Sequence, residues 1–312
     1  MIEARGLTKR YGDKLAVDQL SFRIRPGVVT GFLGPNGSGK STTMRMVMGL
    51  DLPNAGTATV NGERYHDLRW PLHEVGALLE AKAIHPGRSA RAHLQMLADT
   101  HRIPARRIDE VLGLVGLSDV AGRRAGKFSL GMGQRLGIAA ALLGDPGVLL
   151  FDEPVNGLDP DGIRWVRNLL KALAREGRTV FVSSHLMSEM ALTAEQVVVI
   201  GRGRLITETS IEELTSQSSL CYVTVRPARE PERFTQALES QGARVVPEGD
   251  GSFSVHGIEA AEVGDLAGSL AVVLHELSPH SASLEDAYME LTEDSIEFRG
   301  EESLALTKGG SQ

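Results

Sequence analysis

A glycine-rich loop near the N-terminus has the residue types and spacing of a phosphate-binding loop. In the stretch GPNGSGKST, Gly34 is followed by four residues and then by Gly39, Lys40 and Ser41. Glycines allow positive φ angles and let successive backbone N–H groups surround a phosphate. In such loops the lysine contacts the β- and γ-phosphates and the serine hydroxyl binds Mg²⁺. The loop residues expected to bind nucleotide are Gly34, Pro35, Asn36, Gly37, Ser38, Gly39, Lys40, Ser41 and Thr42.

Two adjacent carboxylates follow an apolar run further along the chain. The run VLLFDE ends in Asp152 and Glu153 and has the length and composition of a buried strand. Ligands of open α/β sheets bind at the carboxyl ends of the strands. Asp152 is therefore expected to hold Mg²⁺ through water, and Glu153 to polarise an attacking water. A simple helix-capping role for this pair is the alternative, and the preceding strand and the phosphate loop argue against it.

A second glycine-rich stretch, SLGMGQ, runs from Ser129 to Gln134 and contains no lysine. It leads directly into an apolar run that is typical of a helix. A helix that begins with small residues offers backbone N–H donors and the positive end of its dipole to an anion. Taken alone, the pattern is common at helix starts and is weak evidence for a binding site.

The elements that must position these residues alternate between strands and helices. Apolar runs of strand length occupy residues 28–34, 148–153, 179–184 and 196–201. Their continuous apolarity predicts strands covered on both faces, as in a mostly parallel α/β sheet. Residues 89–143 predict mainly helices, inserted between two parts of that sheet.

The C-terminal third has a different pattern. A polar stretch at 204–218 predicts a linker, and residues 220–277 predict the order βαββαβ of a ferredoxin-like unit. A last helix is expected at 283–293. The final residues, 296–312, predict a disordered tail.

Composition limits the compartment and the partners. The chain has 312 residues, a formal net charge of −7 and one cysteine, with a pI near 5.8. The acidic balance argues against an electrostatic footprint for nucleic acid or for an anionic membrane surface. The lone Cys221 excludes an internal disulfide framework and favours a reducing compartment. The N-terminus lacks the apolar segment of a secretory signal, and the most apolar stretch is interrupted by Asp145 and Pro146. We therefore expect a cytoplasmic chain whose membrane role depends on a partner.

Together these motifs resemble the ATP-binding-cassette (ABC) ATPases. The phosphate loop, SLGMGQ, the strand with Asp-Glu, NGLDP and SSH follow one another in the order and spacing of that family. Within it, the chain is most similar to the ATPase subunits of two-component bacterial exporters of the bacitracin- and daunorubicin-resistance type. The resemblance implies an α/β P-loop core with an N-terminal antiparallel β-subdomain and a helical subdomain at about 87–143. The cassette is expected at 1–215, and a small α+β accessory domain at 216–295.

The resemblance also implies roles for single residues. Two cassettes of the family pair head to tail, and the signature of one faces the ATP of the other. Tyr11 matches the aromatic residue that stacks on adenine, and His185 matches the switch histidine at the γ-phosphate. Asp159 matches the loop that communicates between the paired sites, although it also suits a helix N-cap followed by proline. The signature residues that would face the partner's nucleotide are Ser129, Gly131, Gly133 and Gln134.

Three positions depart from the family pattern. Glu80 occupies the position of a glutamine near the Mg²⁺ and the water, where it keeps an oxygen ligand for Mg²⁺ and adds a negative charge. Glutamate also occurs there in the bacitracin-resistance branch, so it narrows the subfamily. In the signature, Leu130 replaces a glycine and Met132 replaces a further consensus residue. Ser129 and Gly131 are retained, so the site is expected to be active.

The expected function is therefore an ATP-hydrolysing motor for transport, with ATP and Mg²⁺ as cofactors. Its partners would be a second copy or a homologous cassette and an integral membrane permease, at the cytoplasmic face of the membrane. No nucleic-acid partner is expected. Export of a drug, antibiotic or other hydrophobic compound is favoured, but the permease sets the direction, so import stays open. The alternatives are a soluble ABC ATPase acting on ribosomes or nucleic acid, which normally needs a second cassette or a coiled coil, and a P-loop kinase. The kinase alternative leaves the signature and NGLDP without a purpose.

Overall fold

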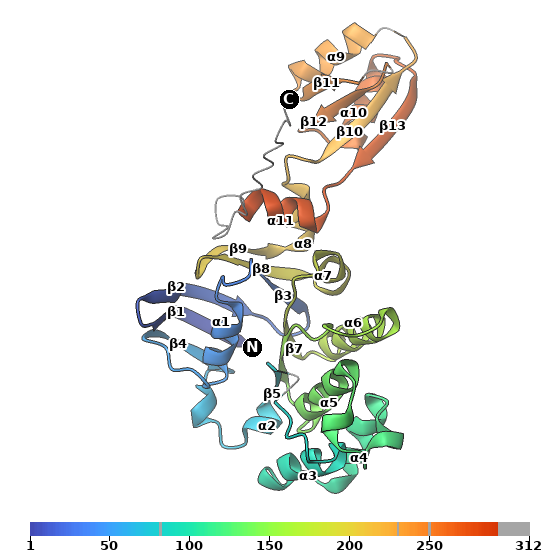
Figure 1. Cartoon of the computed structure of the whole chain (residues 1–312). Helices are drawn as coiled ribbons and strands as arrows, with labels where there is room; N and C mark the ends of the chain where they lie inside the picture. Colours follow the sequence, from blue (N-terminus) through green and yellow to red (C-terminus); the bar gives the residue numbers. More distant parts are fainter. Residues whose placement is uncertain (81–82, 230, 249–250, 293–312) are drawn as a thin grey trace, which may run out of the picture.

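A computed structural model describes residues 1–80, 83–229, 231–248 and 251–292. The predicted tail at 296–312 lies outside the described residues. Figure 1 shows the cassette at one end of the molecule and a separate C-terminal sheet at the other, with α8 and α11 between them.

The central sheet has six strands in the order β5-β6-β7-β3-β8-β9. All neighbours are parallel except β8 and β9, which pair antiparallel. Every residue of β3 and β7 is buried, as their continuous apolarity predicts. The strands are β3 (Val29–Leu33), β5 (Val75–Leu78), β6 (Val148–Asp152), β7 (Thr179–Ser183), β8 (Gln196–Gly201) and β9 (Arg204–Ser210).

Helices follow the strands and also form the inserted helical unit. The predicted run of helices at 89–143 is confirmed by three α-helices and short 3₁₀ turns (Figure 1). The helices of the cassette are α1 (Lys40–Val47), α2 (Pro71–Glu74), α3 (Ala90–Thr100), α4 (Ala105–Leu114), α5 (Leu130–Leu142), α6 (Pro160–Arg175) and α7 (Met187–Thr193). Helix α5 lies close to the central sheet: a Cβ on Gly76 of β5 would lie 1.9 Å from the Ala141 carbonyl oxygen. Glycine at this position therefore sets how near the helix can approach.

The N-terminal residues form the expected antiparallel sheet, in the order β2-β1-β4. Its strands are β1 (Ile2–Tyr11), β2 (Lys14–Ile24) and β4 (Ala55–Val60). Phe22 of β2 packs against Phe32 and Phe181 of the central sheet, with ring centroids 5.8 and 5.6 Å away. This aromatic cluster joins the two sheets through a shared apolar core, which fixes β1 and β2 beside the phosphate loop.

The linker predicted at 204–218 is wrong for most of its length. The chain forms β9 and then α8 (Ile211–Ser216) there. Strand β9 is the last strand of the sheet, and its residues are exposed or half-buried. An edge strand that faces solvent needs few apolar residues, so its polarity resembles that of a linker.

The C-terminal unit confirms the predicted βαββαβ order, and its four antiparallel strands follow the order β11-β12-β10-β13. Its own core includes Val225, Phe234 and Val255. The elements are β10 (Tyr222–Pro227), α9 (Pro231–Ser240), β11 (Arg244–Pro247), β12 (Phe253–His256), α10 (Ala260–Ser269) and β13 (Leu274–His280).

The last helix, α11 (Leu284–Thr292), does not join that core. Leu284 and Ala287 are buried in the core of the cassette, and α11 packs against α7 and α8. Sequence order therefore assigns α11 to the accessory domain expected at 216–295, whereas its packing assigns it to the cassette. Within the described residues, no helix combines the length and apolarity needed to cross a membrane.

Candidate active site

The phosphate loop connects β3 to α1 with the backbone geometry that its glycines predict. Gly37 has a φ angle of 81°, and Gly39, the N-cap of α1, has 103°. Both values lie in the region where glycine is strongly preferred. A Cβ on Gly39 would also lie 2.6 Å from the Ala16 carbonyl oxygen. Substitution there would force the loop away from β2.

Lys40 lies inside this loop. Its Nζ donates hydrogen bonds to the carbonyl oxygens of Gly34 at 2.6 Å and Pro35 at 3.2 Å. Burial lowers the pKa of Lys40, and the nearby carboxylates of Glu153 and Asp152 oppose that shift. The Ser38 hydroxyl is also buried, and no hydrogen-bond partner for it occurs within the described part of the chain. A buried cation and an unpaired hydroxyl at a helix start fit an anionic ligand such as a phosphate.

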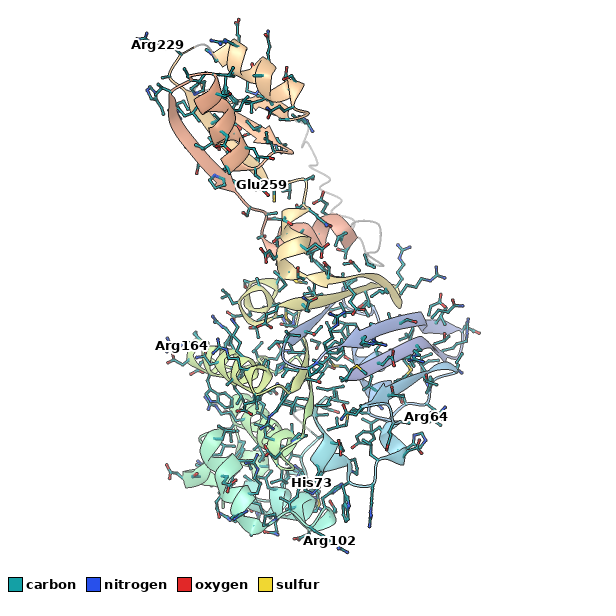
Figure 2. The ribbon with its side chains drawn as sticks, turned by 180° about the vertical axis from the view of Figure 1, so that it is seen from behind. Arg64, His73, Arg102, Arg164, Arg229 and Glu259 are labelled. Atoms are coloured by element: carbon teal, nitrogen blue, oxygen red, sulfur yellow. The ribbon has the colours of Figure 1, made fainter. Side chains whose placement is uncertain are left out.

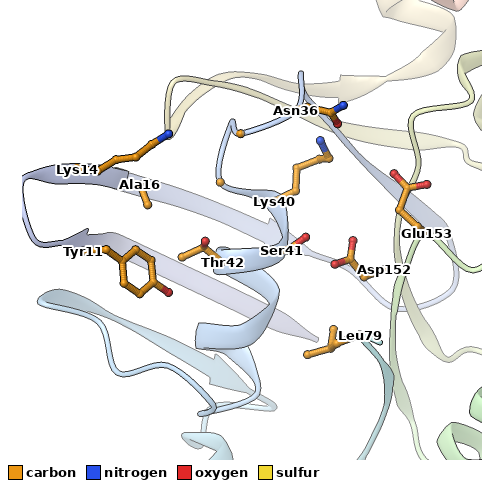
Figure 3. Close-up of a pocket in the computed structure, with 12 residues that line it drawn as sticks. Tyr11, Lys14, Ala16, Asn36, Lys40, Ser41, Thr42, Leu79, Asp152 and Glu153 are labelled. Atoms are coloured by element: carbon orange, nitrogen blue, oxygen red, sulfur yellow. The ribbon is translucent and has the colours of Figure 1, made fainter. Parts of the chain in front are cut away.

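A cavity of ≈ 500 Å³ lies in front of the loop. In Figure 3, Tyr11 lies on one side of it, Asp152 and Glu153 lie on the other, and Lys40 and Ser41 lie between them. The lining consists of Tyr11, Lys14, Ala16, Asn36, Gly37, Gly39, Lys40, Ser41, Thr42, Leu79, Asp152 and Glu153. The phosphate loop, the two carboxylates and the predicted adenine-stacking residue are thus brought together.

Tyr11 ends β1 at the outer edge of the cavity and is 47% exposed. Its hydroxyl donates to Asp51 Oδ2 at 2.7 Å. The Asp51 carboxylate also accepts from Arg45 Nε at 2.8 Å. Partial burial raises the pKa of Tyr11, and the Asp51 hydrogen bond raises it further. The ring is therefore held at its hydroxyl end, and Lys9 Nζ lies over one face at 5.0 Å from the centroid, so a base could stack only on the other face.

Asp152 and Glu153 are positioned by β7, the neighbouring parallel strand. The Ser183 hydroxyl donates to Asp152 Oδ1 and accepts from the Glu153 N–H, whose nitrogen is 3.1 Å away. Glu153 has a φ angle of 53°, in the left-handed region that non-glycine residues rarely adopt. Contacts with its neighbours must hold this strained backbone in place.

His185 follows β7 and contacts the Glu153 side chain. Its Nδ1 lies 2.8 Å from Glu153 Oε2. This hydrogen bond leaves the other ring nitrogen of a half-exposed histidine directed away from Glu153. The predicted base and the predicted switch histidine therefore form one unit.

The signature stretch begins α5, but it does not reach the cavity of its own chain. Ser129 is the N-cap, and its Oγ accepts from the Met132 N–H at 3.2 Å. The helix starts at Leu130, inside the glycine-rich stretch itself. Neither Ser129 nor Gly131 lines the cavity formed by the described residues. Leu130, which replaces the glycine of the family signature, packs its side chain against Gly157 of the NGLDP loop.

The prediction that Gln134 faces a nucleotide is not what its geometry favours. Gln134 is 3% exposed, and its Nε2 donates to the Glu153 carbonyl oxygen at 2.9 Å. Gln134 lies on the side of α5 that faces the sheet, so its amide contacts the backbone just after β6. Gly133 lies in the first turn of α5, where its N–H donates to the Ser129 carbonyl at 2.9 Å.

Asp159 and Glu80 lie outside the cavity lining. Asp159 is the N-cap of α6: its Oδ1 accepts from the Gly162 N–H at 2.9 Å, and Pro160 follows at the first helical position. Glu80 is exposed and lies two residues beyond β5, the strand next to β6. Asp159 therefore caps α6, as the alternative interpretation predicts. Glu80 follows β5 at the carboxyl end of the sheet, and no hydrogen bond joins it to Asp152 among the described residues.

Several residues of the site were not predicted from the sequence. Ser183 belongs to the quoted SSH motif, but nothing in the motif indicates that its hydroxyl bridges the two carboxylate residues. Lys14, Ala16 and Leu79 line the cavity, although they carry no motif of their own. A contact across the sheet or between two sheets leaves no periodic signal in the sequence.

Comparisons with known proteins agree with this geometry. The family model described as ABC transporter matches residues 17–156, and the one described as Domain of unknown function (DUF8746) matches residues 221–285. The chain is 35% identical over 307 residues to the uncharacterized ABC transporter ATP-binding protein YhcH of Bacillus subtilis (strain 168), covering 95% of this chain and 97% of that protein. It is 41% identical over 221 residues to the bacitracin transport ATP-binding protein BcrA of Bacillus licheniformis, covering 70% and 72% respectively.

A solved structure shows the same fold. MJ0796, described as a bacterial ABC transporter cassette in a dimeric structure, aligns with a TM-score of 0.62 and 25% identity over 67% of this chain and 98% of that chain. The full-length relatives and the phosphate loop with its paired carboxylates lead to one assignment. The chain belongs to the ATP-binding proteins of ABC transporters, and it is an ATPase of that family.

Proposed function

We propose that this chain is the ATP-hydrolysing motor of a two-component exporter, working as a head-to-tail dimer with a separate membrane permease. The observation that carries the dimer is the separation of the signature from the cavity of its own chain. Ser129 and Gly131 begin α5 outside the lining of that cavity. A helix start with small residues then suits the γ-phosphate held by a partner chain. The structure of MJ0796, described as dimeric, supports a dimer.

In the proposed site, Glu153 polarises the attacking water and His185 holds the Glu153 carboxylate in place. The hydrogen bond between His185 Nδ1 and Glu153 Oε2 supports this division of roles. The Ser41 hydroxyl and the Asp152 carboxylate line the same cavity and are the oxygen ligands that Mg²⁺ prefers. When bound there, Mg²⁺ would offset the negative charge of the phosphates. We propose that Glu80 would approach the bound Mg²⁺ and the phosphates only when the dimer is closed.

The remaining roles follow the same proposal. Tyr11 would stack on the adenine ring, and Asp159 would transmit changes between the paired sites while it caps α6. The division into a cassette at 1–215 and an accessory domain at 216–295 is part of the proposal, with α11 packed on the cassette. The match to a bacitracin transport ATP-binding protein supports transport of an antibiotic or another hydrophobic compound, and export is the direction we propose. The chain would lie at the cytoplasmic face of the membrane, attached through the permease.

The first experiment identifies the partner. A tagged Glu153→Gln chain is expressed in its native cell, and membranes are extracted with mild detergent and Mg-ATP. Loss of the base should preserve ATP binding and trap the closed dimer. A stoichiometric multi-span membrane protein should co-purify. Ribosomal proteins or DNA without a membrane subunit would show instead that the transport proposal is wrong.

Two variants test the dimeric site directly. Glu153→Gln should convert the purified chain from a monomer to a dimer when ATP is added, measured by light scattering. Ser129→Arg should abolish turnover and leave ATP binding to the single chain intact, because Ser129 lies outside its own cavity. Loss of ATP binding in the Ser129→Arg chain would contradict the assignment of Ser129 to the partner's site.

A further inference from the structure

Six residues at the end of the molecule opposite the C-terminal unit form a basic cluster around one tryptophan. We call Arg69, Trp70, His73, His101, Arg102 and Arg106 the Arg–Trp cluster. They come from α2 with the loop before it, from the α3–α4 turn and from the start of α4. Helix α2 and the α3–α4 turn lie side by side: His73 Nε2 is 3.1 Å from the His101 carbonyl oxygen. Figure 2 labels His73 and Arg102 at the same end of the molecule.

The tryptophan ring is flanked by cations. The Arg69 and Arg102 guanidinium carbons lie 5.9 and 5.5 Å from the centroid of the half-buried Trp70 ring. Arg69, Arg102 and Arg106 are exposed, and among the described residues none of the three forms an ion pair with a carboxylate. Burial and the neighbouring His73 lower the pKa of His101. This shift favours the neutral form of His101, whereas Arg69, Arg102 and Arg106 stay charged at neutral pH.

The net charge of −7 conceals a separation of charge along the chain. Residues 64–107 contain eight Lys or Arg and four Asp or Glu, a net charge of +4. Residues 221–292 contain four Arg and twelve Asp or Glu, a net charge of −8. Figure 2 places Arg229 and Glu259 of the acidic unit at the end opposite His73 and Arg102. The expectation that the acidic chain lacks a footprint for an anionic membrane surface thus ignores this distribution.

We propose that the Arg–Trp cluster docks on anionic lipid headgroups of the membrane in which the permease lies. The inference rests on the proposed function only in that the chain works next to a membrane. It requires no contact between the cluster and the permease. Arginines near a negatively charged leaflet are attracted to its headgroups, and a tryptophan ring suits the depth at which headgroups and acyl chains meet. The acidic C-terminal unit is repelled by the same surface. The two effects together orient the helical end of the cassette toward the membrane.

Charge complementarity favours lipid over nucleic acid as the occupant. A nucleic-acid groove needs a row of cations that follows a backbone, often with several aromatic rings. The cluster instead groups its cations around a single indole. The carboxylates of these segments have other partners: Asp67 lies 3.4 Å from His66 Nε2, Glu74 accepts from Asn61 Nδ2 at 3.4 Å, and Glu110 and Asp145 pair with Arg107 at 3.0 and 3.1 Å. They do not neutralise Arg69 or Arg102.

The test measures partition of the purified full-length chain onto vesicles. One set is phosphatidylcholine, and in the other about a third is replaced by phosphatidylglycerol, both in about 0.1 M salt. The wild-type chain should float with the anionic vesicles only, and about 0.5 M salt should release it. Arg69→Gln with Arg102→Gln should weaken partition about 25-fold, since each cation near the surface contributes about fivefold.

Arg164→Gln with Arg229→Gln is the matched control. It makes the same change in net charge at two exposed arginines elsewhere on the molecule, both labelled in Figure 2. Its partition should stay within about twofold of wild type, because those sites lie outside the cluster. Thermal unfolding and ATPase activity of each purified variant show that it has folded.

Three results would overturn the proposal. They are equal binding to both kinds of vesicle, equal losses in the two double variants, and tighter binding to duplex DNA than to anionic vesicles at the same salt. The vesicles contain no permease, so a failure here leaves the co-purification of a permease untouched. Conversely, vesicle binding without a co-purifying permease would refute the transport proposal, and the lipid-binding role of the Arg–Trp cluster would still hold.

Discussion

Replacing Ser183 by alanine removes one buried hydroxyl that contacts both carboxylate residues at the end of β6. Its Oγ donates to Asp152 Oδ1 and accepts from the Glu153 N–H at 3.1 Å. Ser183 is 0% exposed, so water cannot replace the hydroxyl without opening the sheet. Alanine keeps the Cβ and fits the same space. The substitution therefore changes hydrogen bonding and leaves packing almost unchanged.

The expected effect can be estimated from these contacts. The Glu153 N–H retains the Ser183 carbonyl oxygen at 3.3 Å as a second acceptor, so the main loss falls on the Asp152 carboxylate. A hydrogen bond to a charged group contributes about 1.5–3 kcal/mol. If that loss falls entirely on the transition state, kcat for ATP hydrolysis should fall roughly 10- to 150-fold. KM for ATP should change little, because the phosphate loop is untouched.

Ser184→Ala is the matched control for this prediction. Ser184 is 4% exposed, and its Oγ accepts from the Leu186 N–H at 3.0 Å without contacting Asp152 or Glu153. In urea, Ser184→Ala should lose about 1 kcal/mol of free energy of unfolding and Ser183→Ala about 1.5–3 kcal/mol, because only Ser183 donates to a carboxylate. Only Ser183→Ala should lose turnover in a steady-state ATPase assay. Equal losses of kcat in the two variants, or a raised KM at unchanged kcat, would refute the positioning role of Ser183.

Three further substitutions test other contacts of the site and of the C-terminal helix. Gln134→Leu removes the donor to the Glu153 carbonyl and should lower kcat about tenfold at unchanged ATP affinity; wild-type turnover would contradict this coupling. Gly157→Ala should lower the free energy of unfolding in urea by about 1–2 kcal/mol, since the φ angle is 74° and the new Cβ would lie 2.2 Å from Leu130 Cδ2. Leu130→Ala in the same chain should restore part of that loss, and no recovery would exclude the steric contact. Burial raises the pKa of Tyr288 to about 12, which means that the folded state holds the phenol in its neutral form more strongly than the unfolded chain does. Its contribution, roughly 1 kcal/mol after allowance for partial exposure, is complete below pH 10 and is lost as the pH rises toward 12. Tyr288→Phe should therefore shrink the shift in urea midpoint between about pH 9 and about pH 11, and an unchanged shift would contradict the assignment.

The parts of the site that lie close together in sequence could be predicted. The phosphate loop needs positive φ angles within a few residues of a lysine, and only a glycine pattern such as that of Gly37 and Gly39 supplies them. Asp152 and Glu153 were predictable because a buried strand must end at the ligand-binding edge of the sheet. The ferredoxin-like order could be read for a similar reason, since each of its elements has its own local period.

Contacts between distant segments could not be read in this way. The same glutamine, Gln134, can face a partner's nucleotide or its own sheet, depending on a small rotation of α5. Its donation to the Glu153 carbonyl oxygen joins two distant segments and shows only in three dimensions, and its role toward a partner's nucleotide stays a prediction. Strand β9 was mistaken for a linker because an exposed edge strand and a linker share a polar composition. The return of α11 to the cassette depends on packing against α7, which lies about a hundred residues earlier.

That return places α11 against α7, the helix that follows His185. His185 lies in the short loop after β7, α7 begins two residues later, and α11 packs against α7. The chain enters and leaves the C-terminal sheet at one place, where the Ala282 N–H donates to Cys221 Sγ at 3.4 Å. Glu290 of α11 accepts from the Ser218 hydroxyl at 2.8 Å and ties the helix to the entering segment. Helix α11 therefore contacts both the segment that enters the C-terminal sheet and α7, so any coupling between that sheet and the proposed nucleotide site would pass through these contacts and would be reciprocal.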